Sequence, residues 1–375
     1  MKELKLTQGQ FISIGMCYMM GSILHSAFVS SVAGRDSWLI PFICALMFLP
    51  VAAMCIVLVK RHPDKDLFGI NEAALGPVLG RFVSFLYAVF FLCIASLNAS
   101  ELENFVTANL LNETSIVVIT IVTIGTCCYA LGKGLNTIAR LPMTVLVLGI
   151  AVLGFEIIIS IQQMDFTNVQ PILAQEPMVY VRSGHIMSSI SLGESIGMLI
   201  FAGKLKQKNS GFTRGYLFIL GYSVLYLSVT HLRETLLLGR VAEFSMLPSF
   251  DAVRLINFGT SLSSTESIYS LMMMTFSMFR ILISFYGTLQ ALKHILRLEH
   301  YKSLLLPVGA LIAVYSLKIM GSAGDSFYFG TTTSPFFWTA FEFVLPTITL
   351  IGSLIRGFVK KRRETDKPAK MRAEA

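Results

Sequence analysis

The sequence predicts an all-α integral membrane protein with about ten transmembrane helices. Three observations lead to this fold class: 54% of the 375 residues are hydrophobic, only 14% are charged, and the mean hydropathy is +0.69. An ordinary soluble domain carries about 25% charged residues. The chain therefore has too few charges to cover a water-soluble surface, and its apolar residues form runs that are long enough to cross a bilayer.

The apolar runs give the approximate limits of the spans. A hydrocarbon core about 30 Å thick needs roughly 20 helical residues at 1.5 Å each, and ten runs approach this length. Numbered one to ten, the expected spans cover residues 9–32, 38–59, 81–100, 114–131, 140–162, 185–203, 213–232, 267–292, 303–320 and 335–358. We therefore expect residues 1–375 to form a single transmembrane domain.

Basic residues indicate the orientation. The net charge of +8 is divided among short clusters between the apolar runs, as in membrane proteins, so it gives no reason to expect a nucleic-acid partner. Cytoplasmic loops are enriched in Lys and Arg, so the side that holds more of them is inside. The inner segments would hold Lys2, Lys5, Lys60, Arg61, Lys65, Arg81, Lys133, Arg140, Lys204, Lys206, Lys208, Arg214, Lys293, Arg297, Lys302 and the "KKRRE" cluster. The outer segments would hold chiefly Arg35, Arg182, Arg233, Arg240, Arg254 and Lys318. Both termini are therefore expected in the cytoplasm.

Two segments outside the spans carry expectations of their own. The longest outer segment, about 233–266, includes "LPSFDAVRLINFG", whose apolar residues recur at roughly helical spacing and predict a surface helix at an extracellular mouth. Residues 359–375 form a cytoplasmic basic tail, which is expected to be disordered and to lie against anionic lipid.

The sequence gives no support for an enzyme or a metal site. It lacks the GxxxxGK[ST] and HExxH patterns, and its GxSxG match at 193–197 lies within an apolar run that is expected to cross the bilayer. Its six cysteines all lie in apolar runs and have no CxxC pair or metal-type spacing, so they are expected in the core. We therefore expect no enzymatic activity, no cofactor and no metal.

Spans one and six carry weak helix formers at mid-depth, in "GMCYMMGSILHSA" and "ISLGESIGM". The residues concerned are Gly15, Gly21 and Ser22 in span one and Gly193, Glu194, Ser195 and Gly197 in span six. Backbone groups freed by a helix break in a bilayer must face a protected cavity, which often holds a ligand. Spans one and six correspond if the chain divides into five-helix repeats over 9–162 and 185–358, so they predict an inverted-repeat transporter architecture with a ligand site at the breaks. The alternative is that these small residues only allow close helix packing.

Glu194 strengthens the prediction of a site in span six. An ionised group at mid-bilayer costs at least a few kcal/mol, so we expect Glu194 to face a cavity. There it could bind an amino group, carry a proton or accept hydrogen bonds from unwound backbone. The structural alternative is a helix-packing carboxylate paired with Arg280, which lies deep in span eight and is a candidate for coupling or gating. Five other polar residues in or near the spans are expected to be structural or interfacial: His25, Glu101, Glu103, Glu156 and Glu342.

A series of short segments resembles a known family. "GSIL" at 21–24, "AGRDSWL" at 33–39, "NTIAR" at 136–140, "VQPIL" at 169–173 and "GE" at 193–194 occur in that order over ten spans. This pattern resembles the B subunit of endospore germinant receptors, over nearly the whole chain.

The resemblance implies a fold, a site and partners. It implies the amino acid–polyamine–organocation superfamily and a leucine-transporter-type fold in which spans one and six are unwound around the ligand. The ligand-facing residues would be Gly21, Ser22, Ile23 and Leu24 in span one and Gly193 and Glu194 in span six. The ligand would be a germinant, usually an amino acid, with a sugar or nucleoside as alternatives. The partners would be a membrane-embedded A subunit and a lipoprotein C subunit in the inner membrane of the dormant spore.

Two departures from the family pattern bear on the ligand. No Pro occurs between Leu24 and Gly34, where relatives often have one after the break in span one, and Thr114-Ser115 replaces the Thr-Pro that often opens span four. The first departure concerns the geometry of span one, and hence which ligand fits.

Three functions remain compatible with the sequence. The chain could be a ligand-sensing subunit, an amino-acid permease coupled to protons through Glu194, or a scaffold whose pocket is vestigial. The sensor and the permease share a fold and a site, so only the resemblance favours sensing.

Overall fold

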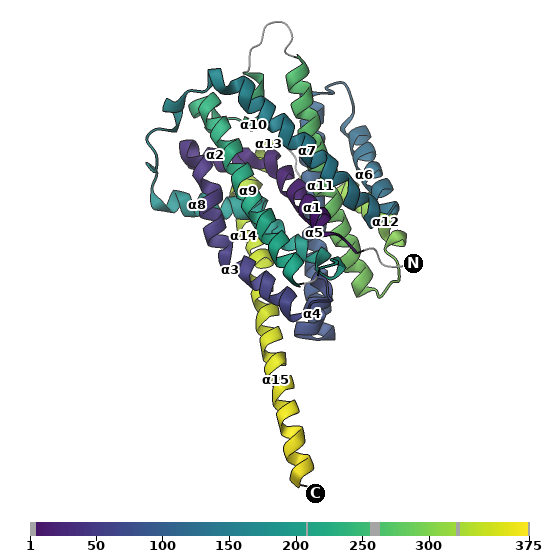
Figure 1. The fold of residues 1–375 in the computed structure, drawn as a ribbon. Helices are drawn as coiled ribbons and strands as arrows, with labels where there is room; N and C mark the ends of the chain where they lie inside the picture. Colours follow the sequence, from purple (N-terminus) through teal and green to yellow (C-terminus); the bar gives the residue numbers. More distant parts are fainter. Residues whose placement is uncertain (1–4, 208, 256–262, 320–322, 374–375) are drawn as a thin grey trace.

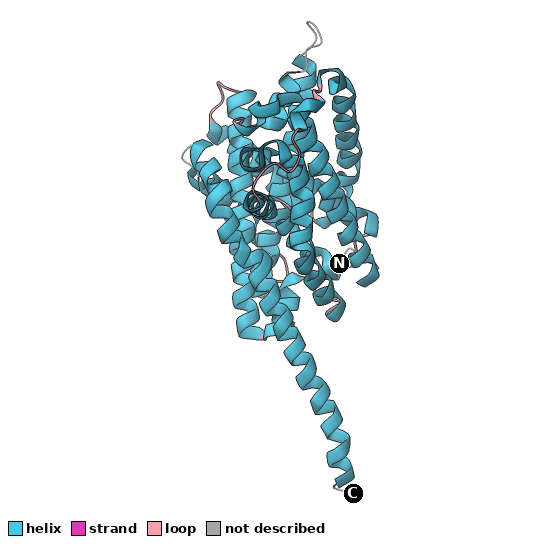
Figure 2. Cartoon of the chain, turned by 90° about the vertical axis from the view of Figure 1, so that its left-hand side faces the viewer, coloured by secondary structure: helices cyan, strands magenta, loops and turns pink. Residues whose placement is uncertain are grey.

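The computed structural model describes residues 5–207, 209–255, 263–319 and 323–373, which form a bundle of helices (Figure 1). Helices suit a bilayer because they satisfy the backbone N–H and C=O groups within the segment itself. In the described ranges no β-strand forms (Figure 2), and one isolated parallel bridge pairs Leu6 with Leu205. The all-α prediction is confirmed.

The helices follow one another along the chain with short connections. Their bounds are α1 Gln8–Met20, η1 Gly21–His25, α2 Ser26–Ala33, η2 Gly34–Leu39, α3 Ile40–Arg61, α4 Leu67–Leu75, α5 Pro77–Asn109, α6 Ile116–Gly132, α7 Leu135–Ser160, η3 Ile161–Gln163, η4 Phe166–Val169, α8 Pro177–Ile190, η5 Leu192–Lys204, α9 Asn209–Leu238, η6 Gly239–Glu243, α10 Pro248–Arg254, α11 Ser263–Ile295, η8 Lys302–Leu304, α12 Leu305–Ile319, α13 Ala323–Tyr328, η9 Phe329–Thr333, α14 Ser334–Thr339, η10 Ala340–Val344 and α15 Leu345–Ala373.

Eight helical segments among the described residues are long and apolar enough to cross a membrane. The first, Gln8–Arg61, has 54 residues, which is enough for both span one and span two. A shorter apolar helix, Ile116–Gly132, corresponds to span four. Each of the ten predicted spans overlaps one of these helices.

Several segments differ from the predictions, and α5 and α8 are longer than expected, since α5 ends at Asn109 and α8 begins at Pro177. α9 continues past residue 232 to Leu238, because Arg233 and Glu234 are buried and bonded inside the bundle. α4 is an additional short helix between spans two and three. The expected disordered tail is wrong, since α15 continues to Ala373; its Lys, Arg and Glu are good helix formers and extend a helix that span ten has already started.

The predicted outer surface helix is present as α10. Its buried side chains include Phe250 and Val253, which hold it against the bundle. Residues 256–262, which contain the remainder of the quoted pattern, lie outside the described residues.

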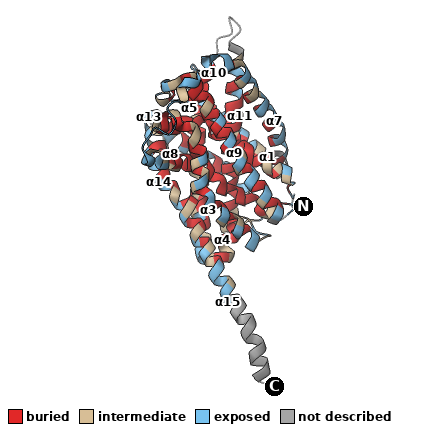
Figure 3. Ribbon diagram, turned by 60° about the vertical axis from the view of Figure 1, so that its left-hand side comes forward, coloured by how far each residue is buried: buried red, intermediate tan, exposed pale blue. Residues whose placement is uncertain are grey.

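α5 and α11 pack along each other at the centre of the bundle. Buried residues are concentrated in the middle and exposed ones along the outside, as Figure 3 shows. α4 packs against α15 at one end of the bundle, here called the α4 end. α10 lies at the opposite end, here called the α10 end (Figure 1).

Two segments far apart in the sequence meet at the α10 end. The buried carboxylate of Asp36 accepts hydrogen bonds from the Leu173 N–H at 3.2 Å and from the Tyr180 hydroxyl at 2.6 Å. The Arg35 guanidinium donates to the carbonyl of Gln170. The "AGRDSWL" segment, which follows α2, is therefore hydrogen-bonded to the "VQPIL" segment, which lies in the loop that leads into α8.

Candidate functional site

Both predicted breaks are present. In span one, the 3₁₀ segment Gly21–His25 separates α1 from α2. In span six, α8 ends at Ile190, the chain turns at Ser191 with φ −151° and ψ −87°, and η5 continues as a 3₁₀ helix. Spans one and six are thus interrupted at corresponding positions, as the predicted architecture requires.

The two breaks touch each other through serine hydroxyls. The Ser22 hydroxyl donates to the Met19 carbonyl at 2.7 Å and lies 3.3 Å from the Ser191 hydroxyl. Ser22 therefore links the break in span one to the break in span six.

Glu194 connects three spans. Its Oε1 lies 2.7 Å from Arg280 Nη2, and its Oε2 accepts a 2.9 Å hydrogen bond from the Tyr18 hydroxyl. Arg280 Nη2 also donates to the Ile190 carbonyl at 2.5 Å, and the guanidinium lies 5.5 Å from the centre of the Tyr18 ring. Glu194 is 3% exposed and Arg280 is 0% exposed, so this ion pair, the structural alternative for these residues, is enclosed by protein.

Three of the predicted glycines lie in tight contacts between helices. A Cβ at Gly21 would lie 2.6 Å from the Phe276 carbonyl oxygen, and a Cβ at Gly193 would lie 2.1 Å from Oε2 of Glu342. A Cβ at Gly197 would lie 3.2 Å from the Phe91 ring. In this conformation the space beside these glycines is filled by other residues of the chain. Close packing, the alternative explanation for the small residues, therefore accounts for all three here.

The other predicted ligand residues, Ser195, Ile23 and Leu24, are also buried. The Ser195 hydroxyl lies 2.9 Å from the Tyr216 hydroxyl of α9. Ser195 therefore has a partner within the protein in this conformation.

A cavity of about 20 Å³ adjoins Glu194. It lies between spans one, three, six and ten and is lined by His25, Phe28, Ile94, Leu97, Asn98, Glu101, Ser189, Ile190, Glu194, Ser326, Phe329, Gly330, Ser334 and Trp338. This volume has room for about one water molecule. Of the predicted site residues, Glu194 is the one that lines it.

Two residues that were expected to be structural or interfacial, His25 and Glu101, also line this cavity. His25 Nε2 lies 2.6 Å from Glu101 Oε2, and the Ser326 hydroxyl lies 3.4 Å from Glu101 Oε1. His25 is the last residue of the break in span one, a position that could have marked it in the sequence. Glu101 gave no such signal, because only the fold shows that α5 turns it towards His25.

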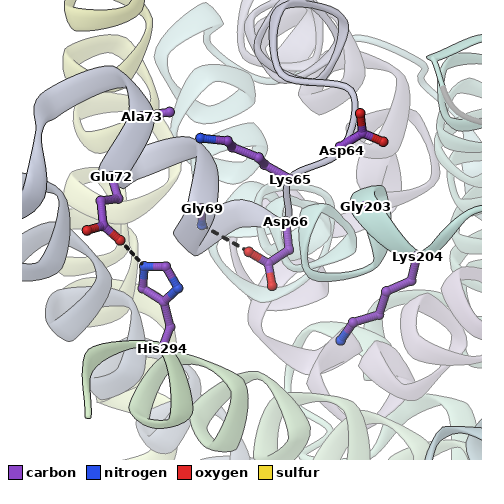
Figure 4. Close-up of a pocket in the computed structure, with 9 residues that line it drawn as sticks. All are labelled: Asp64, Lys65, Asp66, Gly69, Glu72, Ala73, Gly203, Lys204 and His294. Carbon is purple, nitrogen blue, oxygen red and sulfur yellow. Dashed lines mark hydrogen bonds and ion pairs between the residues drawn. The ribbon is translucent and has the colours of Figure 1, made fainter. Parts of the chain in front are cut away.

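A second hollow, of about 450 Å³, opens at the α4 end (Figure 4). Its charged side chains come from α4 and the turn before it, from the end of η5 and from α11. His294 lies 2.8 Å from Glu72 Oε2, and Asp66 accepts from the Gly69 N–H at 2.9 Å. Burial raises the pKa of the Glu72 carboxyl, but the charges of His294 and Arg81 outweigh it and leave the pKa below its usual value. Opposite charges therefore compensate each other in this hollow.

Packed side chains along η5 separate the two hollows. Glu194 and Lys204 lie near its two ends, about 20 Å apart at the 2.0 Å rise of a 3₁₀ helix. Between them, Phe201 stacks on Tyr286 with ring centres 5.6 Å apart. Phe91 fills the space beside Gly197, and a Cβ at Gly287 would lie 2.9 Å from the same ring. The central cavity is thus closed towards the α4 end.

The fold and its two breaks define a membrane protein of the leucine-transporter type. The structure is similar to Mhp1, a nucleobase-cation-symport-1 family transporter, in a closed conformation with bromovinylhydantoin bound; the TM-score is 0.65 at 9% identity, over 92% of this chain and 78% of that chain. It is also similar to the manganese transporter of Eremococcus coleocola in complex with an aromatic bis-isothiourea substituted compound, with a TM-score of 0.55 at 13% identity, over 93% and 85% of the chains. At these identities the likeness concerns the fold alone.

The spore germination protein family matches residues 5–321, and the chain belongs to this family. It is 28% identical to spore germination protein A2 of Bacillus subtilis (strain 168) over 229 residues, which are 60% of this chain and 62% of that protein, less than two thirds of its length. It is 20% identical to spore germination protein KB of the same organism over 374 residues, 98% of each chain. The family is a permease-like one and not an enzyme family, in agreement with the sequence.

Proposed function

We propose that this chain is the membrane subunit of a spore germinant receptor, which binds a small germinant beside Glu194 and signals through partner subunits. The observation that carries the proposal is the meeting of two interrupted helices at a polar cavity in a member of a spore germination family. The germinant is an amino acid, with a sugar or nucleoside as alternatives. The proposed ligand contacts are Gly21, Ser22, Ile23, Leu24, Gly193, Glu194, Ser195 and Gly197.

Binding requires the cavity to widen. Ligand pockets have volumes of about 300 Å³ or more, whereas the cavity beside Glu194 measures about 20 Å³. A germinant would therefore favour a more open conformation, and it shifts the equilibrium by its difference in affinity for the two conformations. The proposed readers of this shift are the A and C subunits in the spore inner membrane, with both termini of this chain in the cytoplasm.

The test uses spores whose only germinant receptor contains this chain. A screen of single amino acids, sugars and nucleosides identifies the germinant, and the response is then compared between the wild type, Glu194→Gln and Glu103→Gln. Glu103 is a matched control, because it is fully buried in α5 and accepts a hydrogen bond from Ser316, away from the breaks. We expect Glu194→Gln to raise the half-maximal germinant concentration about tenfold, which corresponds to about 1.4 kcal/mol. Equal responses of the two variants at equal subunit abundance would contradict the proposal.

The second candidate function is a proton-coupled permease, which the fold of the two transporters favours. The permease predicts that labelled germinant accumulates in vesicles containing this chain alone when a proton gradient is applied. The sensor predicts binding to the same vesicles without accumulation.

A further inference from the structure

Glu342 lies at the break in span six but belongs to span ten. It sits in η10, a π-helical segment, and is 0% exposed. Its Oε2 accepts a 2.9 Å hydrogen bond from the Ser188 hydroxyl, and its Oε1 has no hydrogen-bond partner among the described residues. Gly193 leaves the space that the carboxyl group occupies, since a Cβ there would lie 2.1 to 2.6 Å from its atoms. Span ten therefore packs on the break through a carboxyl group.

Glu342 and its neighbour Glu194 are two carboxyl groups that share a single positive charge, that of Arg280. Glu194 of η5 and Arg280 of α11 are its charged neighbours, and Arg280 is paired with Glu194 and with the Ile190 carbonyl. The other titratable groups near Glu342 are Tyr87 of α5, Cys44 of α3 and, beside Thr339 one turn earlier, His185 of α8. Tyr87 donates its hydroxyl hydrogen to the Phe341 carbonyl, not to Glu342. Glu342 thus has one hydroxyl donor and no cation of its own within the described part of the chain.

An ionised carboxylate in this setting is strongly disfavoured. Moving a charged group from water into the protein interior costs several kcal/mol of solvation free energy. The single hydrogen bond from the Ser188 hydroxyl offsets only part of this cost. A metal cation would need several oxygen ligands around it. No polar atom partners Oε1 of Glu342, and no group of three His, Cys, Asp or Glu that could hold a metal occurs among the described residues. The ligand that fits without further space or further oxygens is a proton.

We infer that Glu342 is a proton-binding site and that its proton stabilises the packing of span ten against the break in span six. The inference concerns a different residue from the proposed germinant contact and holds whether the chain senses or transports a solute. A conformation that admits water to the carboxyl group favours loss of the proton. Acid therefore favours the closed break and alkali favours an open one.

Infrared spectroscopy of the full chain in lipid nanodiscs tests the site directly, since a protonated carboxyl group absorbs apart from a carboxylate. At neutral pH we expect Glu342→Gln to lose one carboxylic-acid band that the wild type and the exposed control Glu113→Gln retain. An unchanged band in Glu342→Gln would overturn the inference.

A further variant decides the matter if Glu342→Gln folds poorly. Ser188→Ala keeps the glutamate but removes its hydrogen bond, so the acid band should shift to higher frequency; the absence of a shift would refute a protonated Glu342. The thermal stability of the wild type should also fall as the pH rises, because the folded chain binds this proton more tightly than the unfolded chain. This slope should be shallower in Glu342→Gln, and parallel slopes would count against the site.

Discussion

Tyr18, Glu194 and Arg280 form a contact between spans one, six and eight, and charge gives this contact its strength. A hydrogen bond to a charged group contributes about 1.5 to 3 kcal/mol, more than a neutral one. Tyr18 supplies such a bond to Glu194 from the helix that precedes the first break. The relative positions of the two breaks therefore depend on a few side chains.

Removing the Tyr18 hydroxyl should weaken this contact. We expect Tyr18→Phe to lower the free energy of unfolding in detergent by about 2 kcal/mol, because Glu194 loses a buried donor. Tyr328→Phe makes the same chemical change at a side chain that is 66% exposed and should have little effect. Equal stability of the two variants in a denaturant titration would show that the bond contributes nothing.

Enlarging Gly193 should act through Glu342. The added methyl group of Gly193→Ala would overlap the carboxyl group, so we expect a loss of about 1 to 3 kcal/mol. Gly221→Ala is the control, since a Cβ there meets nothing within 4 Å. In the Glu342→Ala background, Gly193→Ala should cost much less. An equal cost in both backgrounds, measured as a double-mutant cycle, would contradict the overlap.

The sequence identified Glu194 and Arg280 because a charge in an apolar run stands out. Tyr18 could not be found in this way, since an aromatic residue in a span carries no such signal. Glu342 was visible as a charge, but its role depends on what faces it, and a contact between spans six and ten is not encoded in either span alone.

At the scale of the elements, α9 shows how burial extends a helix. Charges at 233 and 234 predicted the end of span seven, yet the helix continues because these charges have partners. Arg233 Nη1 lies 2.5 Å from Glu156 Oε2, and Nη2 donates to the Ser249 carbonyl at 3.0 Å and to the Tyr269 hydroxyl at 3.1 Å. Arg233 therefore joins α7, α9, α10 and α11 at the α10 end.

Breaking this junction should be severe. We expect Arg233→Ala to cost about 3 to 5 kcal/mol, because it leaves Glu156 buried without its charge partner. Arg240→Ala removes an exposed arginine close by and should change stability by less than about 0.5 kcal/mol. Thermal unfolding of both variants in the same detergent is the measurement. A small effect at Arg233 would mean that Glu156 finds another partner.

The aromatic packing beside η5 gives a second test of an element. Phe91→Ala should cost about 3 to 5 kcal/mol and open space next to Gly197 and Gly287. Phe85 lies on the same helix but is 49% exposed, so Phe85→Ala should cost far less. Comparable losses in the two variants would show that Phe91 is not needed to close the space between the two hollows.

For the whole molecule, hydropathy was sufficient to predict the fold class, because ten apolar runs leave few alternatives in a bilayer. The small helix α4 was not predicted, since it is too short to span. The closed state of the cavity could not be predicted either, because its volume depends on how side chains from four spans interdigitate. The limits of the two repeats, 9–162 and 185–358, remain a prediction.

The orientation proposed for the molecule can be tested with an impermeant thiol reagent on intact cells. We expect Glu113→Cys, in the turn between α5 and α6, and Ala174→Cys, in the loop before α8, to react from outside. Asp64→Cys, in the turn before α4, should react only after permeabilisation. The reverse pattern would place both termini outside.

The bridge between Leu6 and Leu205 ties the start of the chain to the exit of span six. The Leu6 N–H donates to the Lys204 carbonyl at 2.7 Å, and the Lys206 N–H donates to the Leu6 carbonyl at 2.9 Å. Any displacement of η5 along its axis must therefore carry Leu6 with it or break both of these hydrogen bonds. The exit of span six and the segment that leads into span one are thus joined by backbone groups, independently of the side chains at the two breaks.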